Sequence, residues 1–263
     1  MALTYEKLND TQKKNAALIN AALTKYGITN PNFRAGVLAV VAKESGFIPK
    51  NEISYADTSN TRIREVFGSR VAALSSTQLT ALKKDPKAFF NRVYGGQFAI
   101  GRQLGNTQPN DGYNYRGRGF NQNTGRGNYA MLSKKLGIDL VSNPDKMNDP
   151  AVAAEALAIY FVNGFAAGKN TIIRKYGVND QSKIDTLRKG TDIAYNINAG
   201  IGNNPAADTT GGYKQTLDSM SSYLKSLGEL TLTETQKKMG FGLVGLLAIA
   251  GGIYYYLKTK KKI

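Results

Sequence analysis

Apolar residues recur every three to four positions in several parts of this chain, which is the spacing of amphipathic helices. The second of these segments has clear boundary signals, because Asn30 and Pro31 provide a cap and a first-turn proline and Gly46 follows the last apolar turn. The pattern therefore predicts a mainly α-helical protein. The predicted helices cover residues 11–26, 32–45, 150–165 and 211–227.

Residues 95–126 lack this periodicity and are rich in Gly, Asn, Gln and Arg. Such a composition is typical of loops, because glycine and asparagine favour turns over regular elements. The sequence predicts loops with a short hairpin in this stretch.

The far end of the chain is predicted to be a single membrane anchor. Residues 239–257 carry no charged side chain, and as a helix they would extend about 28 Å, close to the ~30 Å hydrocarbon core of a bilayer. Three tyrosines end this run, and the basic tail at 258–263 follows them, as at a membrane interface. Residues 228–238 would be the linker, and the C-terminus would face the cytoplasmic or equivalent inner side. The alternative is a buried core helix with a solubilising tail.

The composition narrows the chemistry that the chain can perform. Its 263 residues are 41% hydrophobic and 21% charged, which is typical of a globular protein, and they include no cysteine, histidine or tryptophan. Ser-His-Asp triads, Cys-His nucleophiles, disulfide frameworks and imidazole or thiolate zinc sites are therefore excluded. A pair of carboxylates is the simplest acid/base device that remains.

The chain is strongly basic, with a formal net charge of +16. Six lysines follow the last acidic residue, Glu234, so the preceding residues still carry a net charge of +10. The main domain is expected to prefer anionic partners. A bacterial cell wall, a nucleic acid and a lipid headgroup surface all satisfy this condition.

Two glutamates are candidates for a carboxylate pair. Glu44 lies at the predicted C-terminal end of a helix after an apolar run, where the helix dipole and apolar neighbours favour the protonated form that a general acid needs. Glu52 lies in a polar stretch that would keep it ionised, as a general base requires. Two unrelated surface glutamates are the alternative, because the spacing does not set the distance between the two groups.

The segment at 111–129 alternates glycine, arginine and aromatic residues. It could bind nucleic acid through arginines and stacked aromatics. Alternatively, its glycines could let the backbone approach a bulky ligand, with Gln122, Thr124 and Asn128 donating hydrogen bonds to sugar hydroxyls and acetamides. The segment is short and lies between predicted helices, which favours the second interpretation.

Four successive strings resemble the motifs of glycoside hydrolase family 19, a family of chitinases and bacteriophage lysozymes. They read AKESGF, NEISYADTSNTRIREVFGSR, DGYNYRGRGFNQNTGRGNY and AYNINAG, in this order, and the resemblance covers residues 26–200. It implies a mainly α fold with two lysozyme-like lobes around a long substrate cleft. The catalytic domain would then occupy residues 1–227.

The resemblance also implies roles for individual residues. Glu44 would be the general acid, Glu52 the general base, and Thr124 would help to hold the attacking water. The reaction would proceed by single displacement with inversion, for which the two carboxyl groups lie ~6.5–9.5 Å apart. The substrate-binding residues that it implies are Gln122, Asn128, Asn198, Tyr115 and Arg118.

Three features depart from the family pattern. Lys43 stands where the family usually has a histidine, and a cation beside Glu44 would favour its ionised form unless the lysine points away. Ala199 replaces a glycine. The family's tryptophans are absent, with Tyr113 and Phe161 near those positions.

Our leading expectation is a membrane-anchored peptidoglycan hydrolase, a muramidase that cleaves the β-1,4 glycan strand. The absence of an N-terminal signal pattern leads us to expect a phage lysin, or a virion component that opens the wall during entry. The protein would then reside in the membrane of a lipid-containing virion or in the host inner membrane. Its partners would be peptidoglycan, the bilayer and either a second copy or other virion proteins, with no nucleic acid and no cofactor or metal.

Two alternatives remain open. One is a chitinase acting on N-acetylglucosamine polymers, although the lack of cysteine argues against the disulfide-bonded secreted chitinases. The other is a non-catalytic membrane protein that uses the fold to bind the wall, an interpretation suggested by Lys43 and Ala199.

Overall fold

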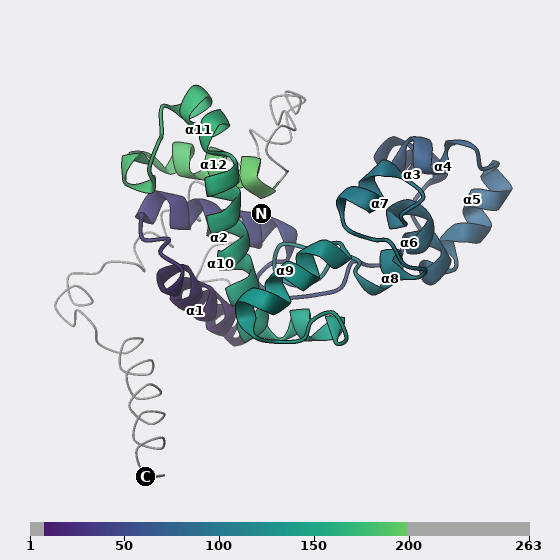
Figure 1. The fold of residues 1–263 in the computed structure, drawn as a ribbon, viewed down its shortest axis with the longest axis horizontal. Coiled ribbons are helices and arrows are strands. Elements are labelled where there is room, and N and C mark those ends of the chain that lie inside the picture. Colours follow the sequence, from purple (N-terminus) through teal and green to yellow (C-terminus); the bar gives the residue numbers. More distant parts are fainter. Residues whose placement is uncertain (1–7, 199–263) are drawn as a thin grey trace, which may run out of the picture.

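The computed structural model describes residues 8–198, which form a mainly helical protein with two lobes (Figure 1). The large lobe contains the first two helices and the last three, and the small lobe contains the helices between residues 60 and 114. The large-lobe helices are α1 (Asp10–Lys25), α2 (Pro31–Glu44), α10 (Pro150–Ala167), α11 (Lys169–Tyr176) and α12 (Leu187–Asn198). The small-lobe helices are α3 (Asn60–Phe67), α4 (Ser69–Ala72), α5 (Ser76–Lys83), α6 (Pro86–Tyr94), α7 (Ala99–Gln103) and α8 (Asp111–Asn114). Three further elements are α9 (Arg126–Leu136) and the 3₁₀ helices η2 (Pro144–Asn148) and η3 (Gln181–Lys183).

Each lobe has its own apolar core. In the large lobe α1, α2, α10 and α12 share a core that includes Leu23, Phe33 and Phe161. The small lobe has an aromatic core, in which Phe67 and Phe89 meet edge to face with ring centroids 5.3 Å apart. A third cluster around Tyr129 joins α9 and η2 to one face of α10. Separate cores allow each lobe to hold its shape while a cleft remains between them.

The helix boundaries of α2 follow from local sequence. The side chain of Asn30 accepts a hydrogen bond from the backbone amide of Phe33, and Pro31 occupies the first turn. The chain leaves the helix at Gly46, whose φ of +59° lies in the left-handed region. The helices predicted over 11–26, 32–45 and 150–165 are confirmed as α1, α2 and α10, with ends shifted by one or two residues.

The prediction for residues 95–126 is only partly right. The short helices α7 and α8 interrupt this stretch, and the expected hairpin is reduced to one antiparallel bridge between Arg118 and Asn123. Elements of four or five residues are too short to show a hydrophobic period. They are held by side chains instead: the buried carboxylate of Asp111 accepts hydrogen bonds from the amides of Thr107 and Gln108.

Several predicted segments lie outside the described residues. These are the helix at 211–227, the linker at 228–238 and the membrane anchor at 239–257. Within the described part, α10 alone is long and apolar enough to cross a membrane by length and composition, with a mean hydropathy of 1.4. Its buried side chains belong to two of the protein's cores, as expected for the central helix of a globular domain.

Candidate active site

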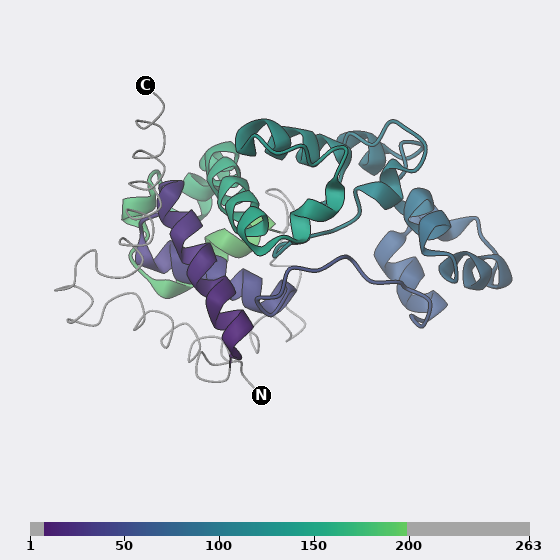
Figure 2. The ribbon, with the colours of Figure 1, turned by 90° about the horizontal axis from the view of Figure 1, so that it is seen from below.

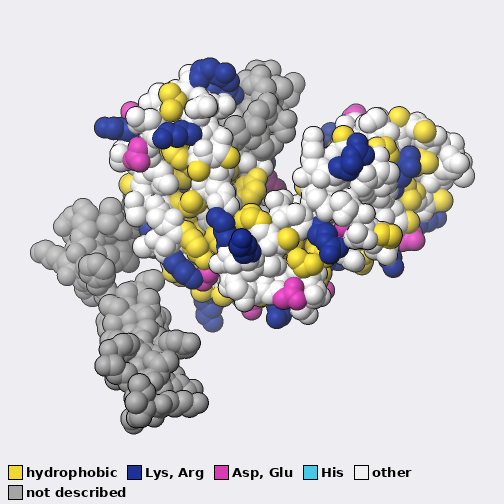
Figure 3. All heavy atoms as spheres, viewed as in Figure 1, with side chains coloured by type: hydrophobic (Ala, Val, Ile, Leu, Met, Phe, Trp, Pro, Cys, Tyr) yellow, Lys and Arg dark blue, Asp and Glu magenta, His cyan; other side chains and the backbone are white. Residues whose placement is uncertain are grey.

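A deep hollow separates the two lobes (Figure 3). Seen from below, the extended segment between α2 and α3 crosses from the large lobe to the small one (Figure 2). Glu44 ends α2 at the start of this crossing, and Glu52 lies within it. Both glutamates are partly exposed. The first is thus attached to the large lobe, whereas the second lies on the path to the small lobe.

A close helix pair positions the partner of Glu44. A methyl group on Gly36 of α2 would overlap the carbonyl oxygen of Gly190 of α12, so the two backbones touch where they cross. Glu44 and Asn198 each lie eight residues beyond the glycine of their own helix, a rise of about 12 Å in both helices. The Asn198 Nδ2 donates a long hydrogen bond of 3.4 Å to Glu44 Oε1. The glycine crossing therefore sets the register that brings this amide to the carboxylate.

Lys43 directly precedes Glu44 in the sequence, but its side chain contacts Tyr195. Its ammonium lies 4.9 Å from the ring centroid of Tyr195 on α12, in a cation–π contact. No ion pair between Lys43 and Glu44 occurs in the described part of the chain. Adjacent helical residues point about 100° apart, which allows this separation.

Glu52 accepts hydrogen bonds from three donors. The hydroxyls of Tyr55 and Tyr94 each donate to Oε1 at 2.9 Å. The backbone amide of Gly117 donates to Oε2 at 3.2 Å, and the Glu52 amide donates in return to the Gly117 carbonyl at 2.7 Å. The carboxylate is therefore held by the small lobe through α6 and by the loop that precedes α9.

The two tyrosines remain hydroxyl donors over a wide pH range. Burial, followed by the negative charge of Glu52, raises the pKa of Tyr94 and of Tyr55 far above the usual value. Sequence reasoning missed both residues. Tyr55 follows Glu52 by three positions in the same motif, which was a usable signal, but nothing near Tyr94 in the sequence indicates its contact.

Three further predicted residues, Gln122, Thr124 and Asn128, are linked to one another by contacts that begin beside Glu52. A Cβ on Gly117 would lie 2.9 Å from Gln122 Oε1 and 3.3 Å from Glu52 Oε2, so these two side chains flank one glycine. The Thr124 hydroxyl donates to the Gln122 carbonyl at 3.0 Å, and Asn128 Nδ2 donates to the Thr124 carbonyl at 2.7 Å. All three side chains are partly exposed, as surface contacts to a ligand require.

Tyr115 and Arg118 are placed differently from the prediction of direct substrate contact. Tyr115 is 4% exposed, lies in the cluster around Tyr129 and donates its hydroxyl to the Val141 carbonyl at 3.0 Å. Arg118 is 2% exposed and forms an ion pair with Asp145 at 2.9 Å. Their burial makes them supports of the glycine-rich loop, because their polar groups are already engaged inside the protein.

Phe161 and Tyr113, the aromatic residues near the positions of the family's tryptophans, differ in how far they are buried. Phe161 is fully buried in the core of the large lobe and offers no face to a sugar. Tyr113 is partly buried, and the Arg116 guanidinium lies 4.2 Å from its ring centroid.

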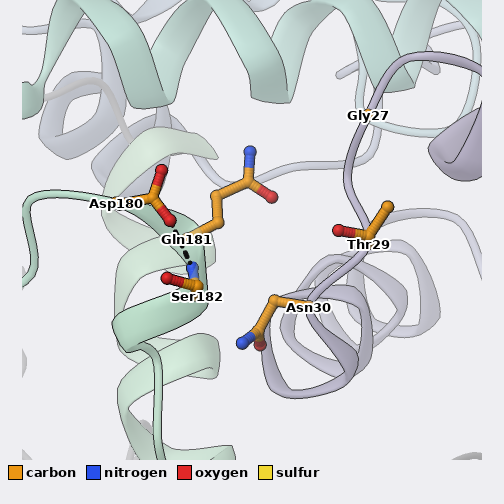
Figure 4. A pocket seen from close by; sticks show the side chains of 6 residues that line it. All are labelled: Gly27, Thr29, Asn30, Asp180, Gln181 and Ser182. Atoms are coloured by element: carbon orange, nitrogen blue, oxygen red, sulfur yellow. Dashed lines mark hydrogen bonds between the residues drawn. The ribbon is translucent and has the colours of Figure 1, made fainter.

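A polar pocket of about 400 Å³ opens elsewhere on the large lobe (Figure 4). It lies at the start of α2, whereas Glu44 ends that helix about 20 Å away. The pocket is therefore separate from Glu44. It is lined by Gly27, Thr29, Asn30, Asp180, Gln181 and Ser182.

The chemistry that Glu44 and Glu52 offer is that of two carboxylates with different surroundings. Glu44 has one weak amide contact, whereas Glu52 accepts three hydrogen bonds. Such a difference is what assigns acid and base roles to paired carboxylates. Within residues 8–198, no three acidic side chains gather as the ligands of a metal ion would.

Comparison with known proteins gives one informative match. No protein-family model matches the chain. It is 33% identical over 126 residues to a protein from Haemophilus influenzae that is described as a glycosyl hydrolase family 19 domain-containing protein. The match covers 46% of the chain and 58% of the length of that relative. Over that part of its length, the chain is therefore similar to a protein with a glycosyl hydrolase family 19 domain.

Proposed function

We propose that the protein is a glycoside hydrolase that cleaves the β-1,4 glycan strand of peptidoglycan, that is, a muramidase. The observation that carries the proposal is that Tyr55, Tyr94 and the Gly117 amide hold Glu52, whereas Glu44 on the large lobe contacts Asn198. The similarity to a family 19 domain-containing protein supports the same class of reaction.

The proposed mechanism uses one carboxyl group as acid and the other as base. Glu44 donates a proton to the glycosidic oxygen as the bond to the anomeric carbon breaks. A water on the opposite face of the sugar attacks that carbon, and the Glu52 carboxylate takes its proton. The attacking water would also contact the side chain of Gln122 or Thr124. Gln122 lies beside Gly117, as Glu52 does, and the Thr124 hydroxyl donates to the Gln122 carbonyl.

The choice of peptidoglycan follows from charge. The chain carries a formal net charge of +16, and the wall of a bacterium is anionic, whereas chitin is neutral. The test digests purified sacculi with the full-length chain in mild detergent and identifies the products by mass spectrometry. Products that end in reducing N-acetylmuramic acid support a muramidase. Products that end in N-acetylglucosamine, or cleavage of chitin oligomers alone, would overturn that assignment.

Variants of the two glutamates test the mechanism. Glu44→Gln and Glu52→Gln should each lower kcat by at least about 100-fold, because each removes a proton-transfer group. Glu65→Gln is the matched control, since Glu65 is an exposed glutamate on α3 that forms an ion pair with Arg62 at 3.1 Å. Full activity in the Glu44 or Glu52 variant would contradict the proposal, and loss of activity in the Glu65 variant would indicate a general effect of the substitution.

We further propose that residues 239–257 anchor the enzyme in a membrane, as part of a phage lysin or of a lipid-containing virion. The support is the length of the uncharged run and its basic flanks. The measurement is sedimentation of the full chain with membranes after an alkaline wash, followed by mass spectrometry of purified virions. A chain that stays in the supernatant would exclude the anchor, and its absence from virions would leave only the lysin.

A further inference from the structure

We propose that Tyr55 and Tyr94 are positioning residues that aim the Glu52 carboxylate, leaving Oε2 as the oxygen that takes the proton from the attacking water. This inference rests on the proposed function and deepens it. Both hydroxyls donate to the same oxygen, Oε1, at 2.9 Å. The residues come from separate parts of the small lobe, Tyr55 from the segment before α3 and Tyr94 from the last position of α6.

The positions of the two hydroxyls are set by aromatic packing. The ring of Tyr55 lies 5.2 Å from the centroids of both Phe67 and Phe89. The ring of Tyr94 stacks on Phe90, with centroids 6.1 Å apart and planes 5° from parallel. Because these phenylalanines form the small-lobe core, neither hydroxyl can move far without disturbing that core. The packing of the small-lobe core thus fixes the position of the Glu52 carboxylate through the two tyrosine hydroxyls.

The two oxygens of Glu52 are consequently unequal. A carboxylate oxygen offers about two lone-pair sites, and the two tyrosine hydroxyls occupy those of Oε1. Among the described residues, Oε2 accepts one hydrogen bond, from the Gly117 amide at 3.2 Å, which leaves one site for a further donor. Oε2 is also the oxygen beside Gly117 and near Gln122. A water that donates to Oε2 would therefore lie next to the predicted ligand-binding residues of the loop.

The groups of the described residues that face this carboxylate are hydrogen-bond donors or carry positive charge. The two tyrosine hydroxyls donate to it, and burial keeps both protonated by raising the pKa of each. The guanidinium of Arg70 on α4 lies 6.0 Å from the Tyr94 ring centroid and interacts electrostatically with Glu52. Removing a hydroxyl should leave Oε1 with one donor fewer and allow the carboxylate to rotate.

The experiment compares Tyr55→Phe, Tyr94→Phe and the double variant in the full-length chain. The first readout is the ¹³C chemical shift of the Glu52 carboxyl at neutral pH, recorded with ¹³C-labelled glutamate and assigned with Glu52→Gln. This resonance should move in each variant and furthest in the double variant, because the carboxylate loses one hydrogen bond for each hydroxyl removed. The second readout is the rate of wall hydrolysis as a function of substrate concentration. The kcat should fall about tenfold, the size expected for one hydrogen bond to a charged group, while KM changes little.

Tyr26→Phe is the matched control. Tyr26 also donates its hydroxyl to a glutamate, Glu155, at 2.7 Å, but in the large lobe and away from Glu52. This variant should leave both readouts at the wild-type values. Phenylalanine retains the ring packing, and thermal unfolding verifies that each variant is folded. If Tyr94→Phe does not fold, Tyr55→Phe carries the same test, because Tyr55 lies outside the helices of the core.

An unchanged Glu52 resonance in the folded double variant would overturn the proposal and leave the tyrosines a packing role only. A change in that resonance that is matched by Tyr26→Phe would overturn it as well. If the wild-type chain hydrolyses neither walls nor chitin while the Glu52 resonance still moves in the tyrosine variants, the positioning is supported and the proposed function fails. The two hypotheses are thereby tested separately.

Discussion

At the scale of single residues, the side chain that contacts Glu44 is not its neighbour in the sequence. Lys43 adjoins Glu44 in the chain, yet its ammonium lies over the ring of Tyr195. Asn198 is remote in sequence, yet its amide is the group that contacts Glu44. Within residues 8–198, no lysine or arginine forms an ion pair with Glu44, Lys43 included.

We predict that Lys43→Gln has little effect on catalysis. The cation–π contact of this exposed lysine contributes about 0.5 kcal/mol to the free energy of unfolding, so the protein should remain folded. The kcat and KM for wall hydrolysis should both stay close to the wild-type values, because the Lys43 ammonium is bound to Tyr195. A large fall in kcat in the folded variant would show that Lys43 acts directly on Glu44.

At the scale of elements, the pairing of α2 and α12 determines part of the candidate site. The helices touch through Gly36 and Gly190, and equal lengths of helix beyond that crossing end at Glu44 and Asn198. Close contact of two backbones needs residues without side chains. The site thus depends on two glycines that lie about 12 Å from it.

We predict that Gly190→Ala separates the two helices. A Cβ at this position would overlap the backbone carbonyl of Asn32, which cannot rotate away as a side chain could. The free energy of unfolding should fall by about 1–3 kcal/mol, as in other overpacked interiors, and wall hydrolysis should fall more than tenfold in the folded fraction. Urea unfolding and initial rates provide the measurements. Arg188→Ala, an exposed change on the same helix, should alter neither.

At the scale of the whole molecule, the ionisable groups predict how stability depends on pH. The sequence has no histidine, so no side chain has its ordinary pKa between pH 5 and 8. Burial raises the pKa of several tyrosines, and for Tyr129 it raises the pKa to about 12. A tyrosine whose pKa is higher in the folded state than in the unfolded chain stabilises the fold below pH ~10, and this stability is lost as the pH rises through the folded value.

We therefore expect the free energy of unfolding to stay nearly constant between pH 6 and about 9 and to fall steeply between pH ~10 and ~12. Absorbance of tyrosinate at alkaline pH should rise together with the loss of helical circular dichroism, because the buried hydroxyls ionise when the chain opens. Ionisation of all tyrosines near pH 10 in a chain that remains helical would contradict this prediction.

The sequence by itself determined the helical class, the boundaries of α1, α2 and α10, and the candidate carboxylates, because caps, glycine stops and hydrophobic period act over a few residues. It also predicted the set at Gln122, Thr124 and Asn128, whose contacts are local. Only the tertiary structure decided that Tyr94 holds Glu52, that Asn198 meets Glu44, and that Tyr115 and Arg118 are buried. These contacts join residues far apart in the chain, and they depend on how helices and loops pack in three dimensions, which no short sequence pattern encodes.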